Sequence, residues 1–149
     1  MRIAGRTAGT LGLALVGAFG VTVAMAGLFG KVLWAPPVEG VVLRDGAPVA
    51  GAVIRRTVRG PGDDQRDETR TGADGRFSME RVAGKRGLPM TQFAAGEEIE
   101  IVVDGRSYAG HVSNQFKIVD PESAQATQLT CDFDNYDSDD PLAVVCREN

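Results

Sequence analysis

The sequence has few histidines, cysteines and aromatic residues, and each shortage excludes a kind of site. Among its 149 residues, 6% are aromatic, two are cysteines, and His111 is the only histidine. One imidazole excludes every centre that needs two, including histidine-rich zinc sites. The cysteines form no CxxC pair and no serine lies in a G-x-S-x-G motif. We therefore expect no catalytic residues, no metal site and no cofactor, so the protein is not expected to be an enzyme.

The chain also lacks a net positive charge. Its formal net charge of −4 argues against a general nucleic-acid binder. With 43% hydrophobic and 24% charged residues it is neither a disordered chain nor a multi-span membrane protein, and its length suits one domain. Residues 118–149 contain eight acidic residues and one basic residue, Arg147. Such an end either binds a cationic protein or keeps the chain soluble.

Residues 1–34 have the pattern of a signal peptide or a signal anchor. Two arginines precede residues 7–30, a run without any charged residue. The small residues around Met25 fit cleavage after Ala26, whereas the uncharged run is also long enough for a membrane span, which needs about 20 residues. An uncleaved span would place Trp34 near the membrane interface. Both alternatives predict a periplasmic location, either soluble or tethered to the inner membrane.

The two cysteines fit an exported protein. Cys131 and Cys146 are an even number near the carboxyl end, and in an oxidising compartment they most simply pair with each other. The bridge would close an acidic loop and stabilise the fold by roughly 3 kcal/mol for a loop of about 15 residues. Two free thiols are the alternative if the leader proves cytoplasmic.

Beyond the leader, the hydrophobic pattern predicts short strands and no helix. Asp-Gly pairs at 45–46, 74–75 and 104–105 predict tight turns, because glycine tolerates a positive φ. We expect an all-β fold, an antiparallel β-sandwich of about seven strands preceded by an N-terminal hydrophobic helix. The strands are expected at residues 38–44, 52–58, 68–71, 76–80, 97–103, 106–112, 116–119 and 126–133.

The predicted organisation has four parts. Residues 1–34 are the leader, and 35–37, Ala-Pro-Pro, are a stiff linker because adjacent prolines favour an extended chain. Residues 38–133 form the sandwich, and 134–149 form an acidic tail closed by the disulfide. Loops are expected at 59–67 and 83–96. The arginines around the first loop, including Arg55 and Arg56, alternate with acidic residues and are expected to be solvated.

Two segments carry a family resemblance. Residues 40–54, GVVLRDGAPVAGAVI, and 69–77, TRTGADGRF, follow the pattern G-x-V, P-x-x-G-A-x-V and T-x-T-x-x-x-G-x-F. They resemble the carboxypeptidase-regulatory-like, transthyretin-related β-sandwich, over about residues 38–133. Residues 101–108 and 129–132 are similar to a narrower group of small bacterial envelope proteins of unknown function.

The resemblance implies positions that specify folding. Pro48 and Gly51 shape the connection into the second strand, whose Ala52 faces the core, and the turn at Gly75 delivers Phe77 to the opposite sheet. It implies no catalysis, because regulatory-like domains lack the zinc site of the neighbouring carboxypeptidases. Transthyretin-related hydrolases use several histidines and a C-terminal Tyr-Arg-Gly-Ser, whereas this chain ends Cys-Arg-Glu-Asn. Domains of this kind act in packing, adhesion or recognition, and some resemble antitoxin-like partners of secreted effectors.

One cluster of acidic residues suggests a binding site. We expect it to bind a partner protein; a solvated loop or a calcium site are the alternatives. The spacing departs from an EF-hand loop, since Tyr136 stands at a ligand position and the sixth position is not glycine. The candidate partner-binding residues are Asp132, Asp134, Asp137, Asp139 and Asp140.

Two functional hypotheses follow. The first is a non-catalytic periplasmic protein-binding module, in its specific form an immunity protein that neutralises a secreted toxin acting in the envelope. The second is a structural accessory of the envelope without a toxin partner, with calcium binding in the tail as an extension. Nucleic acid is not expected as a partner, and the inner membrane is one only if the leader stays uncleaved.

Overall fold

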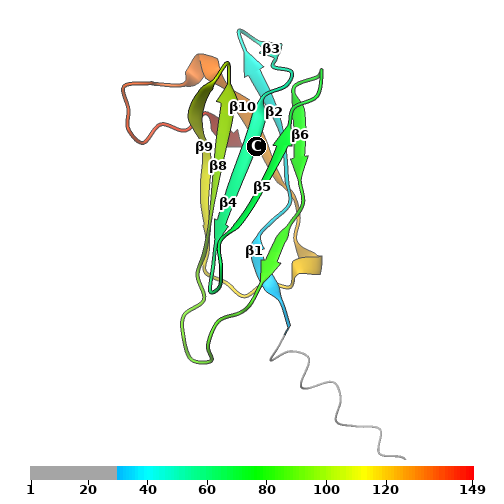
Figure 1. The fold of residues 1–149 in the computed structure, drawn as a ribbon, viewed down its shortest axis with the longest axis vertical. Coiled ribbons are helices and arrows are strands. Elements are labelled where there is room, and N and C mark those ends of the chain that lie inside the picture. The colour runs from blue at the N-terminus through cyan, green and yellow to red at the C-terminus, as the bar shows by residue number, and fades with distance from the viewer. Residues whose placement is uncertain (1–29) are drawn as a thin grey trace, which may run out of the picture.

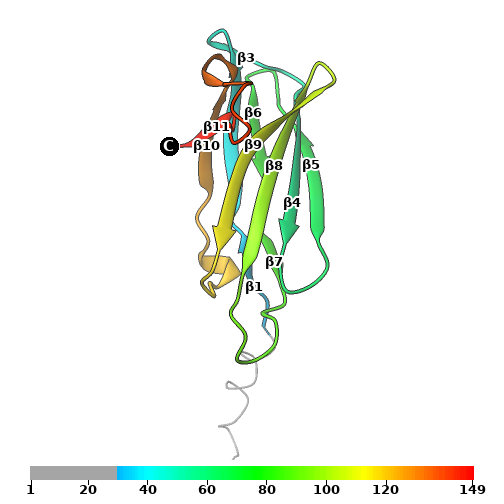
Figure 2. The same ribbon diagram turned by 90° about the vertical axis from the view of Figure 1, so that its left-hand side faces the viewer.

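The computed structural model describes residues 30–149, which form two facing β-sheets and one short two-stranded sheet (Figure 1, Figure 2). The prediction of an all-β chain with antiparallel sheets is confirmed. The expected N-terminal helix and the cleavage site after Ala26 lie outside the described residues. Within residues 30–149, no helix is long and apolar enough to cross a membrane. The elements are β1 (Val32–Ala35), β2 (Val38–Arg44), β3 (Ala47–Pro48), β4 (Val53–Arg59), β5 (Gln65–Arg70), β6 (Arg76–Met79), β7 (Val82–Gly84), β8 (Ala95–Val103), β9 (Arg106–Gln115), β10 (Thr127–Asp132) and β11 (Cys146–Glu148), with short 3₁₀ helices η1 (Pro121–Ser123) and η2 (Phe133–Asn135).

The first sheet has the order β5-β4-β8-β9 and is antiparallel throughout. In the second sheet β2 is central: it pairs with β10 on one side, and with β3 and β6 on the other, while β11 pairs with β10. The β2–β10 pair is parallel. Strands β1 and β7 pair with each other, each directly preceding or following a strand of the second sheet.

Alternating side chains fill the space between the sheets. In β8 every second residue from Ala95 to Val103 is buried, which is the period-2 pattern of a strand with one face on a core. The main cluster of buried side chains takes Val38 and Val42 from β2, and Ile54, Ile99 and Ile101 from the facing sheet. Both sheets therefore bury their inner faces against one another.

A second core cluster lies around Trp34. This side chain is 3% exposed and packs with Val58, Val82 and Phe93. A Cβ added to Gly84 would lie 2.3 Å from the Trp34 ring, so the glycine makes room for the indole. Residues 32–35, predicted as the end of the leader and the start of a linker, are instead a buried strand. The sequence does not separate these residues from the apolar run before them, so their place in the core was missed.

The segments that carry the family resemblance meet in space. Thr71 Oγ1 donates to the Val49 carbonyl at 2.6 Å and accepts from Ala52 N at 2.9 Å, which ties down the connection between β3 and β4. Gly75 has φ +72°, and a Cβ there would lie 2.7 Å from the Val42 carbonyl oxygen. These residues fix the backbone where the chain passes from one sheet to the other.

Several element boundaries differ from prediction. Eleven strands replace the expected seven in the described part of the chain, because β1, β3, β7 and β11 have two to four residues, too few to give a period-2 pattern. Strand β5 begins at Gln65, inside the predicted polar loop, because its residues are polar and nearly all exposed and so give no hydrophobic period-2 pattern. The predicted strand at 116–119 is wrong: that segment has no strand structure, although the Val119 carbonyl accepts from Leu33 N at 2.9 Å.

Candidate partner-binding site

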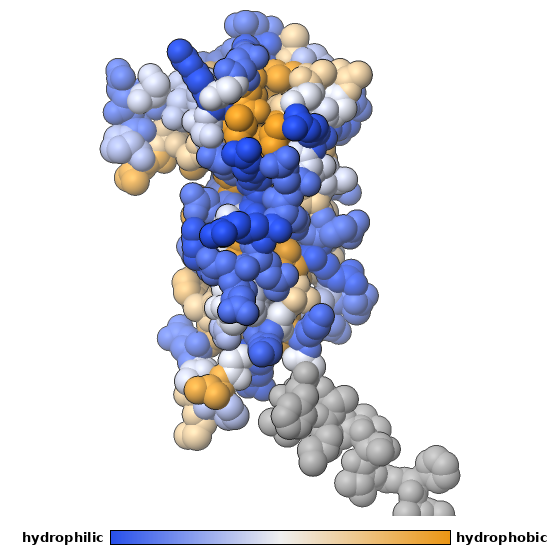
Figure 3. Space-filling view, in the orientation of Figure 1, coloured by the Kyte–Doolittle hydropathy of each residue, from blue (hydrophilic) through white to orange (hydrophobic). Residues whose placement is uncertain are grey.

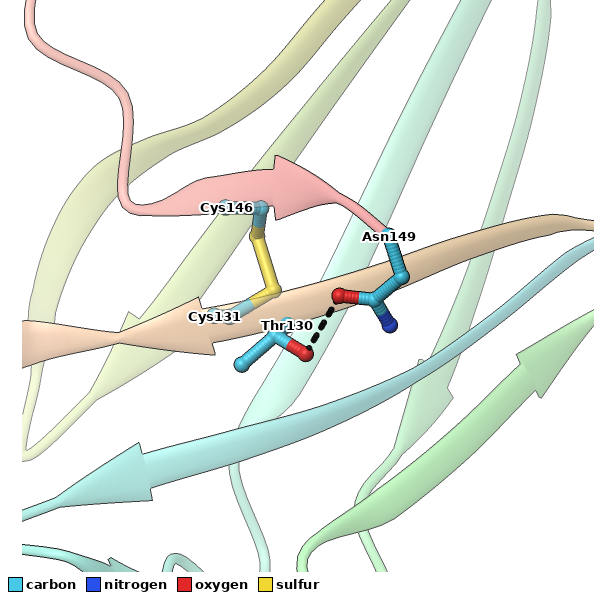
Figure 4. Close-up of a disulfide and its surroundings, with 4 residues drawn as sticks. All are labelled: Thr130, Cys131, Cys146 and Asn149. Atoms are coloured by element: carbon cyan, nitrogen blue, oxygen red, sulfur yellow. Dashed lines mark hydrogen bonds between the residues drawn. A yellow bond between two sulfur atoms is a disulfide. The ribbon is translucent and has the colours of Figure 1, made fainter.

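The acidic residues near the carboxyl end lie between two strands, β10 and β11, that a disulfide joins. Cys131 in β10 lies opposite Cys146 in β11, and the two form the predicted disulfide (Figure 4). Both cysteines are almost fully buried. Thr130 Oγ1 bonds Asn149 Oδ1 at 2.9 Å beside the bridge. The last residues of the predicted tail thus belong to the second sheet. The acidic stretch between β10 and β11 is a loop whose two ends are joined by the disulfide.

Aromatic side chains support the start of this loop. The rings of Phe133 and Tyr136 both meet Tyr108 of β9 edge to face, with centroids 4.8 and 5.6 Å away. The Arg44 guanidinium lies 5.1 Å from the Phe133 ring centre and bonds Asp104 at 2.8 Å. The bond to Asp104 raises the pKa of Arg44, so its charge is secure. The base of the loop therefore contacts both sheets.

Of the five predicted aspartates, four accept hydrogen bonds from backbone N–H groups, and the fifth, Asp139, is exposed. Asp132 ends β10 and accepts from Asp134 N at 3.0 Å, and Asp134 accepts from the backbone N of Asp45 at 2.9 Å. Asp137 accepts from Asp139 N, and Asp140 from Leu142 N, each at 2.9 Å. Each of these bonds uses one carboxylate oxygen on a nearby backbone N–H, which shapes the loop.

We call residues 134–144 the acidic loop. It protrudes beside the sheets, at the upper left of Figure 1. Leu142 is 85% exposed and Val144 is 40% exposed, so two apolar side chains stand among the carboxylates. In Figure 3 this loop is mainly hydrophilic, with a hydrophobic area along its lower edge. An apolar centre beside a charged border is the composition of a protein-binding surface.

The geometry offers little to a metal ion. Within residues 30–149 no group of three or more His, Cys, Asp or Glu side chains is placed to hold one. The loop's carboxylates lie along the chain instead of converging on one point, in keeping with their local backbone bonds.

One known domain matches this chain. The domain of unknown function DUF6795 matches residues 38–136, about two thirds of the sequence. The chain belongs to the DUF6795 family. No curated protein matches it. The DUF6795 match contains every strand except β1 and β11, and it ends at Tyr136, so most of the acidic loop lies beyond it.

Inside the DUF6795 domain, a buried ionic cluster is the second candidate site. The Arg56 side chain points between the sheets and is 1% exposed. It bonds both carboxylate oxygens of Asp67, the Glu80 and Pro36 carbonyls, and Glu97 Oε1 at 3.4 Å. Pro36 lies in the break between β1 and β2, and Glu80 in the break between β6 and β7. Arg56 therefore donates to carbonyls that no neighbouring strand pairs with.

Sequence reasoning placed Arg56 on the surface with its neighbouring arginines, and this is wrong. Arg56 shares the inward parity of Ile54 and Val58 in β4, whereas Arg55 and Arg59 face outward. The alternation of β4 was the signal that could have found it.

Glu97 and His111 complete the buried cluster. Burial raises the pKa of Glu97, and Arg56, Ser113 and His111 partly oppose that rise. Ser113 Oγ bonds Glu97 Oε2 at 3.2 Å, while His111 Nε2 lies 3.3 Å from Glu148 Oε1 without a hydrogen bond. Glu97 is 3% exposed and His111 8%, so little surface of either group meets solvent. The cluster is best explained as part of the core.

The outer face of the β5-β4-β8-β9 sheet carries paired charges. Arg55 lies 3.0 Å from Glu68 and 3.6 Å from Glu100, and Arg59 lies 3.1 Å from Glu98. A shallow hollow of about 580 Å³ lies over these side chains. Since each of these arginines already has an acidic neighbour, this face has less free charge than the acidic loop.

Proposed function

We propose that this DUF6795 protein is a non-catalytic periplasmic binding module that recognises a basic protein through its acidic loop. In its specific form it is an immunity protein that neutralises a secreted toxin acting in the envelope. The cross-link between Cys131 and Cys146 supports an oxidising compartment, where such bonds persist. The burial of Glu97 and His111 supports a role in contact and not in chemistry.

The acidic loop is the observation that carries the proposal. Its carboxylates at Asp137, Asp139 and Asp140 form no ion pair with another described residue, and the exposed Leu142 lies among them. The disulfide and the edge-to-face contact of Tyr136 with Tyr108 hold the loop in place before a partner arrives. A preformed loop loses less conformational entropy on binding than a flexible tail does.

We also propose that the fold is the carboxypeptidase-regulatory-like, transthyretin-related sandwich. Two facing sheets support it, as does the contact of the two motif segments through Thr71 and Gly75. In that framework the loop, and not the motif residues, provides the specificity.

The test uses the full chain and a purified effector encoded beside it. The variant Asp137→Asn, Asp139→Asn, Asp140→Asn removes three charges but keeps an amide oxygen for each backbone bond. Binding is measured by calorimetry at low and high salt. If each lost pair contributes about 0.2–1 kcal/mol, affinity falls roughly 3- to 150-fold and becomes less dependent on salt.

A matched control makes the same charge change at the other end of the sheets: Asp63→Asn, Asp120→Asn, Glu122→Gln. This control should bind as the native chain does. Equal loss in both variants would exclude specific recognition by the acidic loop. Failure of the native chain to bind any neighbouring effector would leave the structural accessory as the better hypothesis.

A further inference from the structure

The end of the molecule opposite the acidic loop has its own surface, which we call the basal end. Strand β1 starts there, and two contacts place its neighbours: Trp34 Nε1 donates to the Lys85 carbonyl, and Leu33 N to the Val119 carbonyl, both at 2.9 Å. The pairing of Ala95 with Gln115 brings the start of β8 beside the end of β9. The loop after β7 and the segment after β9 therefore flank the start of β1 (Figure 1, Figure 2).

Large apolar side chains are exposed at this end. Their exposed fractions range from 49% to 104%, and hydrophobic surface shows at the lower left of Figure 3. Four exposed basic residues lie next to them in the sequence or in space, and none forms an ion pair with another described residue. The apolar residues are Leu88, Met90, Phe116 and Ile118, and the basic residues are Lys31, Lys85, Arg86 and Lys117.

Most acidic residues of the basal end already interact with a basic side chain or a backbone N–H. Glu122 pairs with Arg81, Asp64 lies 3.7 Å from Arg59, and Asp120 accepts from a backbone N–H of η1. Asp63 is exposed. The opposite end carries the acidic loop with Asp134, Asp137, Asp139 and Asp140, so the molecule is electrically polarised along its length.

The position of the leader decides what this surface faces. The uncharged run of residues 7–30 ends two positions before β1 begins at Val32. A residue spans at most about 3.6 Å, so a retained span would leave almost no linker between bilayer and sheets. The basal end, and not the acidic end, would then meet the lipid surface.

We propose that the basal end docks on an anionic lipid bilayer, with its apolar tips in the interface and its four free basic groups on the headgroups. The acidic loop is then held away from the membrane and faces the periplasm. This inference concerns a different surface from the proposed partner site, and neither requires the other.

The experiment measures orientation with two single labels on the full chain. Leu88→Cys at the basal end and Leu142→Cys on the acidic loop each carry an environment-sensitive dye, with the buried native disulfide left oxidised. Both chains are reconstituted in vesicles of equimolar phosphatidylglycerol and phosphatidylcholine that contain brominated lipid. Bromine quenching should be several-fold stronger at 88 than at 142.

Two further arms test recognition by charge. Quenching at 88 should fall in vesicles of phosphatidylcholine alone, and also in the variant Lys85→Gln, Arg86→Gln, Lys117→Gln. The variant Asp137→Asn, Asp139→Asn, Asp140→Asn serves as the control and should quench normally. A normal far-ultraviolet circular dichroism spectrum confirms that each variant is folded.

Three results would overturn the proposal. Equal quenching at 88 and 142 means that the leader tethers the domain without orienting it. Quenching at 88 that is indifferent to lipid charge excludes headgroup recognition. A concentration-dependent spectral shift of the dye at 88 without vesicles means that a second copy of the chain covers this surface.

Discussion

Replacing Arg56 with methionine should destabilise the fold more than any surface change in β4. Methionine fills part of the volume but leaves Glu97 without its cationic neighbour and the Pro36 and Glu80 carbonyls without their donor. Breaking a buried ion pair costs about 3–5 kcal/mol, whereas the two carbonyls, on residues that are half-buried or exposed, can bond water instead and add little. Because Glu97 gains protons more easily when buried, we expect the lower part of this range, about 3 kcal/mol.

The measurement is urea unfolding followed by Trp34 fluorescence. Trp34 is the only tryptophan and is 3% exposed, so its emission should shift to the red on unfolding. With a typical slope of about 1–3 kcal/mol per molar urea, a loss of 3 kcal/mol lowers the midpoint by roughly 1–3 M. Such a loss is a large share of the total stability of a small domain, about 5–15 kcal/mol.

The preceding residue, Arg55, supplies the control. Arg55→Met removes exposed ion pairs with Glu68 and Glu100 and should cost less than about 1 kcal/mol. The double variant Arg56→Met, Glu97→Gln should recover part of the loss, because the carboxylate is no longer left charged in the core. Equal midpoints for Arg55→Met and Arg56→Met would refute the reasoning.

Two other changes have defined outcomes. The double variant Cys131→Ala, Cys146→Ala should lower the free energy of unfolding by about 3 kcal/mol, the chain-entropy value for a loop of 15 residues. A reductant should lower the urea midpoint of the native chain and leave that of the variant unchanged. A native midpoint that does not change with reductant would contradict this. Glu97 has a raised pKa in the fold, so the native state binds more protons than the unfolded chain from about pH 4.3 up to that raised value, and stability falls as pH rises through this window. Glu97→Gln should remove that part of the slope in unfolding experiments from pH 4 to 8, and an identical slope in the variant would show that another group titrates.

The strands with a strong period-2 pattern could be predicted from the sequence. Residues 38–44 match β2, and the hairpin around Asp104-Gly105 is present, with positive φ at both turn residues. The disulfide was predictable because only two cysteines exist. In each case a local signal, in alternation, turn chemistry or count, was enough.

What could not be predicted depends on contacts between distant residues. Strand β11 forms because Cys146 is bonded to Cys131, and β1 forms because Trp34 fits against glycines of other elements. The alternation of β4 marks Arg56 as inward-facing, but the Pro36 and Glu80 carbonyls that it bonds come from two chain interruptions that no local pattern records. The acidic residues are evident in the sequence, but the conformation of their loop follows from the disulfide and from the aromatic contacts with Tyr108.

The placement of β1 sets a limit on where a leader, if there is one, could be cleaved without exposing the core. Trp34 and Ala35 are almost completely buried, and they cover Val58, Val82 and Phe93 in the second core cluster. A chain that starts at Val38, the first residue of the DUF6795 match, would expose this apolar surface at one end of the sheets. Cleavage after Ala26 leaves β1 whole, whereas removal of residues up to the two prolines would not. The folded domain therefore needs its first strand from Val32, and the exposed apolar residues of the basal end lie beside the start of that strand.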